Sequence, residues 1–136
     1  MGDRVILHCD LNCFFASVEL LSYPELREKP VAVCGDPAAR HGIILAKSLP
    51  AKRMGVTTGE AIWQARQKCP ELKVVPPDFP KYVRFAKMMR EIYAEYTDYI
   101  EPFGLDEAWL DVTGHALSGE KIASELRARA KRELGL

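Results

Sequence analysis

The chain lacks the features that mark membrane, secreted and zinc-binding proteins. None of its apolar runs approaches the roughly 18 residues that a membrane-spanning helix needs. The apolar stretch before Asp10 holds only five residues, too few for the core of a signal peptide. The four cysteines include no Cys-x-x-Cys pair, which argues against a zinc site. Without an export signal they predict reduced thiols and a cytoplasmic protein.

An excess of charge of one sign is also absent. The 19 basic and 19 acidic residues balance to a net charge of zero, which gives no support to a nucleic-acid partner. It does not exclude one, because a neutral chain can carry a locally charged site. An apolar content of 48% excludes wholesale disorder, and 136 residues suit one domain or two small subdomains with a shared core.

Short apolar runs and helical periodicity predict an alternation of strands and helices. The strands are expected over 5–9, 31–34, 42–46, 72–75, 99–103 and 108–113, and the first two are expected to be buried on both faces. The helices are expected over 12–20, 48–54, 57–69, 82–99 and 118–134. Asn12, Thr57 with Glu60, and Ser118 are the expected N-terminal caps.

The order of these elements predicts an α+β fold. Without residues 22–78, the order is strand, helix, helix, strand, strand, helix, which is close to the βαββαβ plan of ferredoxin-like folds. The final strand of that plan is missing. Residues 22–78 then form a small α/β subdomain inserted after the first helix. A missing last strand would leave the edge of strand 5–9 open to pairing with another chain.

Three acidic residues at strand ends are the candidate chemical site. Asp10 follows the first strand, and Asp106 and Glu107 open the second strand of a hairpin. Carboxylates that meet at one point suit Mg²⁺ or Mn²⁺. Neighbouring strand residues point to opposite faces, so Asp106 and Glu107 share a site only at a bend, which Gly104 supplies. Solvated turn residues are the open alternative, and Asp111 is expected to be a surface or structural residue.

Four segments resemble the Y-family translesion DNA polymerases. Residues 10–19 (DLNCFFASVE) resemble their first catalytic motif, and residues 105–113 (LDEAWLDVT) resemble their second. Residues 29–33 (KPVAV) and 75–79 (VPPDF) match at the familiar spacing. The resemblance covers the whole chain in register, and it points to the bacterial polymerase IV type or a polymerase V-like relative.

The resemblance implies an error-prone, template-directed DNA polymerase that acts in DNA damage tolerance. Such an enzyme adds dNTPs to a primer 3′-hydroxyl with two Mg²⁺ ions about 3.5–4 Å apart, and Mn²⁺ is an alternative ion. By resemblance, Asp10 and Asp106 bridge the two ions and Glu107 holds the catalytic one. The carbonyl group of Leu11 completes the ligand set.

The resemblance also implies nucleotide contacts. Backbone N–H groups of Cys13, Phe14 and Phe15 at a helix start would receive phosphate oxygens. Phe15 stands at the position of the steric gate, the ring that excludes a ribose 2′-hydroxyl, whereas packing is favoured for Phe14. The family's Thr, Tyr and Arg that contact the triphosphate are replaced here. The residues at those positions are Ala46, Leu49 and Lys52, and Lys47 and Arg53 either compensate or are solvated.

By resemblance, residues 1–21 and 79–136 are the palm, residues 22–78 are the fingers, and the thumb and little-finger domains are absent. Primer–template DNA and a dNTP are the implied partners, with a sliding clamp bound outside these residues. The 136 residues are expected to be inactive alone and to self-associate through the open sheet edge. Two alternatives are a noncatalytic polymerase-like scaffold in a mutagenesis complex and a small metal-dependent hydrolase.

Overall fold

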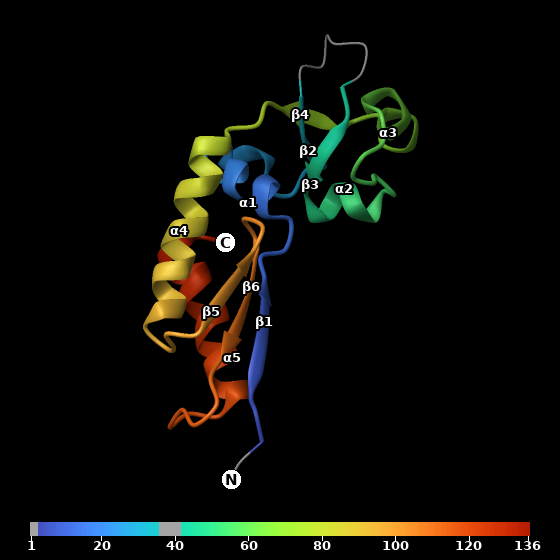
Figure 1. Ribbon diagram of the computed structural model, residues 1–136. Helices are drawn as coiled ribbons and strands as arrows, with labels where there is room; N and C mark the ends of the chain where they lie inside the picture. Colours follow the sequence, from blue (N-terminus) through green and yellow to red (C-terminus); the bar gives the residue numbers. More distant parts are fainter. Residues whose placement is uncertain (1–2, 36–41) are drawn as a thin grey trace. The chain divides into compact units, whose positions relative to one another are not determined.

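The computed structural model describes residues 3–35 and 42–136 and shows an α+β protein with two small sheets (Figure 1). The contacts divide the chain into two compact units. The first unit comprises Met1–Asn12 with Pro80–Leu136, and the second is Cys13–Phe79. Within the described residues, no helix is both long enough and apolar enough to cross a membrane.

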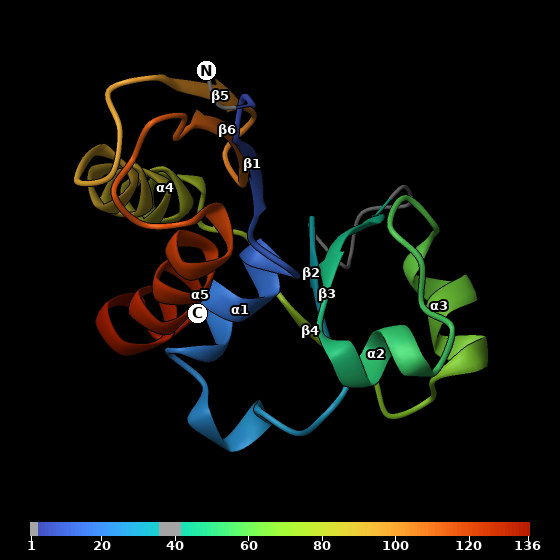
Figure 2. The same cartoon turned by 90° about the horizontal axis from the view of Figure 1, so that it is seen from below.

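The first unit is a three-stranded antiparallel sheet with the order β1-β6-β5. Two long helices, α4 and α5, lie on the same side of this sheet (Figure 2). The strands are β1 (Ile6–Asp10), β5 (Ile100–Phe103) and β6 (Glu107–Asp111), and the helices are α4 (Phe79–Ala94) and α5 (Gly119–Arg129), which continues as the π-helical turn η2 (Ala130–Leu134). The order strand, helix, strand, strand, helix is the predicted ferredoxin-like plan without its last strand.

The core of this unit lies between the sheet and the two helices. The predicted apolar stripe of α5 is buried, with Ile122 at 0%, Leu126 at 4% and Ala130 at 7% exposure. The expectation that the first strand is buried on both faces is wrong. Residues of β1 alternate between exposed and half-buried, because helices cover one face of the sheet and leave the other open.

The second unit has a sheet with the order β3-β2-β4, in which β2 pairs antiparallel with β3 and parallel with β4. Its elements are α1 (Phe14–Leu20), η1 (Pro24–Leu26), β2 (Val31–Cys34), β3 (Ile44–Lys47), α2 (Leu49–Arg53), α3 (Ile62–Lys68) and β4 (Lys73–Val75). Figure 2 shows α1 on one side of this sheet and α2 with α3 on the other. The prediction that β2 is buried on both faces is confirmed. Val31 and Val33 cluster with Ala16 of α1, whereas Ala32 and Cys34 join the cluster that contains residues of α2 and α3.

Several predicted boundaries differ from the structure, among them those of three helices. The helix expected from Thr57 begins at Ile62, because Gly59 has a φ of +92° and its N–H donates to the carbonyl oxygen of Ile44 in β3. The N-cap of α1 is Cys13 rather than Asn12. Helix α4 ends at Ala94 and not near Tyr99, whose carbonyl oxygen accepts a hydrogen bond from Asp111 N in β6. For α3 and α4, hydrogen bonds with a strand override the local pattern.

The division by contacts assigns α1 to the second unit, because α1 packs on β2 and β3. The sequence predicts instead that residues 1–21 belong with 79–136 and that 22–78 form a separate part. That assignment, which rests on family resemblance, stays a prediction.

Candidate active site

The three predicted carboxylates lie at one end of the β1–β6 ladder. Asp10, the last residue of β1, is directly opposite Glu107, the first residue of β6. At the next position the N–H of Leu11 donates to the carbonyl oxygen of Asp106 at 2.9 Å. Two adjacent steps of one ladder therefore carry all three acidic residues.

Asp106 is the last residue of the hairpin turn, and Glu107 directly after it begins β6. Strand β5 ends at Phe103, which pairs with Glu107, and the residues between them form the hairpin turn. Gly104 has a φ of +68°, a backbone conformation that residues with a Cβ atom rarely adopt. Arg90 of α4 fixes the turn by donating to the Gly104 carbonyl oxygen at 2.7 Å. The expected bend is present, so the opposite-face rule for strands does not separate Asp106 from Glu107.

The electrostatics of this end of the sheet are unfavourable for a bare set of carboxylates. Burial raises the pKa of Asp106, and the charges of Asp10 and Glu107 raise it further. A divalent cation would relieve this repulsion, because it stabilises the ionised form of each carboxyl. The oxygen-only chemistry of the three side chains fits Mg²⁺ or Mn²⁺.

The side chains are nevertheless not closed into a ligand cage. Across residues 3–35 and 42–136, no group of three or more His, Cys, Asp or Glu side chains has the spacing of a metal site. The carboxylate of Glu107 is engaged elsewhere, since its Oε1 lies 3.2 Å from Nε2 of His8. His8 stands two residues before Asp10 on the same face of β1. The register places the three acidic residues on adjacent ladder positions, and one carboxylate oxygen of Glu107 contacts His8.

His8 and Trp109 are site neighbours that the sequence analysis missed. They are direct partners in the β1–β6 register, and their rings stack with centroids 4.2 Å apart and planes 16° apart. The period-two alternation of strands already places His8 beside Asp10 on one face. That signal was available in the sequence, but the pairing with Trp109 requires the register.

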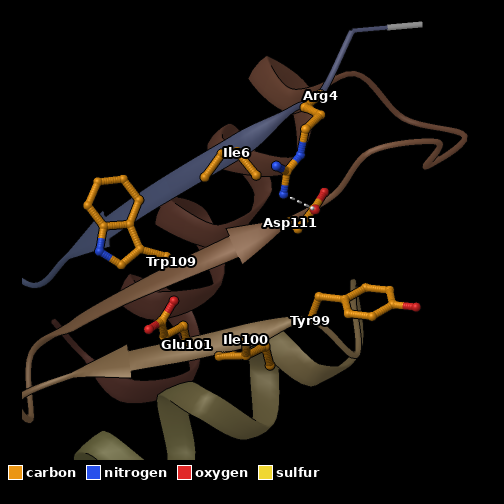
Figure 3. A pocket seen from close by; sticks show the side chains of 7 residues that line it. All are labelled: Arg4, Ile6, Tyr99, Ile100, Glu101, Trp109 and Asp111. Atoms are coloured by element: carbon orange, nitrogen blue, oxygen red, sulfur yellow. Dashed lines mark hydrogen bonds and ion pairs between the residues drawn. The ribbon is translucent and has the colours of Figure 1, made fainter. Parts of the chain in front are cut away.

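The opposite end of the same sheet face carries a shallow hollow of about 520 Å³ (Figure 3). It is lined by Arg4, Ile6, Tyr99, Ile100, Glu101, Trp109 and Asp111. Asp111 pairs with Arg4 at 3.3 Å and accepts a hydrogen bond from Thr113 N. The hydrogen bonds from Thr113 and Arg4 lower the pKa of Asp111. Asp111 is thus a structural residue, as expected.

In the second unit, the two phenylalanines at the start of α1 have different environments. Phe14 is 4% exposed and belongs to the core, in agreement with the packing role favoured for it. Phe15 is half-buried, and its ring meets Phe79 edge-on with centroids 5.6 Å apart. Cys13 precedes them with a φ of +52°, so the chain turns sharply into the helix.

The basic residues predicted to contact a triphosphate lie on or beside α2. Lys52 and Arg53 are exposed in the last turn of this helix, whose N-cap is Ser48. Leu49 is 51% exposed, and Ala46 packs beside the cluster of α1 and β2. The ammonium group of Lys47 donates to Thr58 Oγ1 at 3.1 Å, so it serves the fold of its own unit.

The four cysteines are free thiols in the structure. Burial raises the pKa of Cys34 to about 11, and it also raises that of Cys9 although a hydrogen bond with Tyr93 opposes the shift. These two thiols are therefore protonated at neutral pH and are poor nucleophiles.

Comparison with known proteins decides the family. The family model of the impB/mucB/samB proteins matches residues 9–136, nearly the whole chain. The chain belongs to the impB/mucB/samB family. Curated relatives of this family member include DNA polymerase IV of Acetivibrio thermocellus, 58% identical over 136 residues, which cover 98% of the chain and 34% of the relative. DNA polymerase IV 1 of Bacillus subtilis is 43% identical over 134 residues, 97% of the chain and 32% of the relative.

Solved structures of Y-family DNA polymerases resemble this family member. A post-insertion binary complex of Dbh DNA polymerase aligns with a TM-score of 0.86 at 28% identity, over 96% of the chain and 39% of that structure. DinB from Sulfolobus solfataricus aligns with a TM-score of 0.85 at 28% identity, over 94% and 38%. The predicted fold class and the Y-family resemblance are confirmed. The chain spans about a third of the length of the curated relatives it matches.

Proposed function

We propose that these 136 residues are the palm and fingers part of a translesion DNA polymerase of the polymerase IV type. The observation that carries the proposal is the register at the end of the β1–β6 ladder, where Asp10 faces Glu107 and the next step holds Asp106. A family relationship to proteins named DNA polymerase IV supports the same reaction, the template-directed addition of a dNTP to a primer 3′-hydroxyl.

Two Mg²⁺ ions, or Mn²⁺, would activate the primer hydroxyl and neutralise the charge on the triphosphate when bound. Asp10 and Asp106 would hold both ions, Glu107 would hold one, and the carbonyl oxygen of Leu11 would complete the ligand set. The chain's own contribution is to hold these oxygen atoms on two adjacent ladder steps. Arg90 keeps the turn before Asp106 in place through its bond to Gly104.

The nucleotide contacts that we propose belong to residues 13–53. The backbone N–H groups of Cys13, Phe14 and Phe15 stand at the positive end of α1 and would bind phosphate oxygens. Phe15 would exclude a ribose 2′-hydroxyl. The exposed Lys52 and Arg53 would add positive charge near the triphosphate.

Titration of the 136-residue chain with Mg²⁺ and a dNTP, followed by NMR, tests this function. We expect metal-dependent shifts at Asp10, Phe15 and Glu107, their loss in Asp106→Asn, and weaker shifts with a ribonucleotide. Binding that survives Asp106→Asn unchanged would contradict the assigned metal ligands. No binding of metal or nucleotide would favour the noncatalytic scaffold.

We further propose that the open edge of β1 binds a second copy of the chain. The odd-numbered residues that flank β1 direct their backbone hydrogen bonds toward β6. Val5 O accepts from Val112 N, and Leu11 N donates to Asp106 O. By the antiparallel pattern, the backbone groups of Ile6, His8 and Asp10 point to the open edge. A groove of about 310 Å³ runs beside it between β1, α4 and α5.

Sedimentation across a range of concentrations tests this association. We expect a dimer that weakens in Ile6→Pro, because proline removes an N–H group on the open edge. A monomer at all concentrations would contradict it. Robust primer extension by the 136 residues alone would contradict the expectation that they are inactive alone. Binding of a sliding clamp outside these residues and a cytoplasmic location stay predictions.

A further inference from the structure

The imidazole of His8 is held in a defined plane beside the three carboxylates. It stacks on the indole of Trp109, its direct partner across β1 and β6, with ring centroids 4.2 Å apart. The planes are only 16° apart, so the stack limits rotation of the imidazole about its last side-chain bond. Nε2 is the ring atom that approaches Glu107, which stands two positions further along the ladder, opposite Asp10.

Glu107 has two neighbours on this face of the sheet, Asp10 and His8. Its direct cross-strand neighbour is Asp10, but its carboxylate lies 3.2 Å from Nε2 of His8, one pleat back along β1. The negative charges of Asp10 and Asp106 disfavour a third carboxylate beside them, and the nitrogen of His8 attracts it. The diagonal contact therefore follows from charge as well as from register.

We propose that His8 is a positioning residue for Glu107. Its contact with Oε1 draws the Glu107 carboxylate back along β1 and competes with a divalent cation for this ligand. The inference rests on the proposed function, since it concerns the same metal site. It explains why the three carboxylates converge in register while the described residues contain no closed metal-binding group.

The strength of the contact sets the size of the effect. The side chains of His8 and Glu107 are 41% and 28% exposed, so water screens the interaction. Exposed pairs of this kind change an equilibrium by about two- to five-fold. His8 should thus weaken binding of the cation by that factor. The effect is modest, so the contact reduces repulsion among the carboxylates without preventing the cation from binding.

The test is Mn²⁺ binding by the 136-residue chain, measured by electron paramagnetic resonance of the free ion. His8→Phe keeps an aromatic ring to stack on Trp109 and removes the nitrogen atoms, and we expect it to tighten Mn²⁺ binding about two- to five-fold. In a Glu107→Gln background the same substitution should have no effect. Trp109→Leu, which frees the imidazole, should shift the affinity in the same direction by a smaller factor.

Unchanged or weaker Mn²⁺ binding in His8→Phe would overturn the inference, and so would an equal gain in the Glu107→Gln background. A second readout needs no metal. The carboxylate carbon signal of Glu107 in the metal-free chain should move in His8→Phe, and an unchanged signal would overturn the inference by itself. If the unmodified chain binds no Mn²⁺ although the Glu107 signal moves, the proposed metal site fails while the His8–Glu107 contact stands, so the two failures are distinguishable.

Discussion

Asp10 and Glu107 are direct partners in the antiparallel register of β1 and β6, so both side chains leave the sheet on the same face. Like charges directly opposite one another destabilise a sheet, and the neighbouring turn adds Asp106. The chain thus accepts a local electrostatic cost where the proposed reaction needs ligands. Because of this cost, substitutions of these residues should change the free energy of unfolding as well as the activity.

Asp106→Asn should stabilise the metal-free chain at neutral pH, by about 1 kcal/mol or less. The pKa of Asp106 is raised in the folded state by burial and by Asp10 and Glu107. Between its ordinary value and this raised value the folded chain binds more protons than the unfolded chain, so stability falls as the pH rises through that window. Urea unfolding in a chelator from pH 3.5 to 7 measures the difference between the two variants, which should grow with pH.

Asp111→Asn is the matched control, and its effect on the free energy of unfolding should have the opposite sign. The hydrogen bonds from Thr113 and Arg4 lower the pKa of Asp111, so the ionised carboxyl stabilises the folded chain. This substitution should destabilise the chain at pH 7, and the difference should vanish as the pH falls through the lowered pKa. A destabilising effect of Asp106→Asn at pH 7 would contradict the repulsion described for the candidate site.

Phe15→Ala should reduce the preference for deoxynucleotides over ribonucleotides. The proposed gate acts by filling space, and removal of a side chain that excludes a small group changes discrimination by about tenfold. NMR titration of the chain with Mg²⁺ and each nucleotide measures the ratio of affinities. Phe14→Leu, a change in the buried neighbour, should leave the ratio unchanged. An unaltered ratio in Phe15→Ala would remove Phe15 as the gate.

Ser48→Ala should lower the free energy of unfolding by about 1–3 kcal/mol, because it leaves a buried donor unsatisfied. Ser48 is 2% exposed, and its hydroxyl oxygen accepts from Val31 N at 2.9 Å and also caps α2. Ser118 caps α5 on the surface by accepting from Lys121 N at 3.2 Å. Ser118→Ala should cost less, about 1 kcal/mol. Urea unfolding compares the two, and a larger loss in Ser118→Ala would refute the ranking.

Gly119→Ala should destabilise the chain by about 1–3 kcal/mol, although alanine is the better helix former. A Cβ at Gly119 would lie 2.7 Å from Cγ1 of Val5, and the β-branched side chain of valine moves little. Gly35→Ala is the control, because no heavy atom lies within 4 Å of its added Cβ. Thermal unfolding should place Gly35→Ala near the unmodified chain, and an equal or higher melting temperature for Gly119→Ala would contradict the close packing of α5 on the strand.

Local patterns determined much of this fold. The unbroken apolar run Val31–Cys34 correctly predicted a strand covered on both faces, and the three- and four-residue spacing in α4 and α5 correctly predicted helices with one buried stripe. The motifs around Asp10 and Asp106 were sufficient to indicate the family and the candidate ligands. Such features depend on periodicity and residue type, which are properties of the sequence itself.

Contacts between distant segments decided the rest. The one-sided burial of β1, the start of α3 at Ile62 and the stack of His8 on Trp109 depend on which strands pair and in what register. A shift of one residue in the pairing of β1 and β6 would send Asp10 and Glu107 to opposite faces. The sequence by itself therefore determined which residues are the candidates for the site. Only the tertiary structure decided that Glu107 turns to His8, because the balance between attraction and repulsion there is set by distances across two strands.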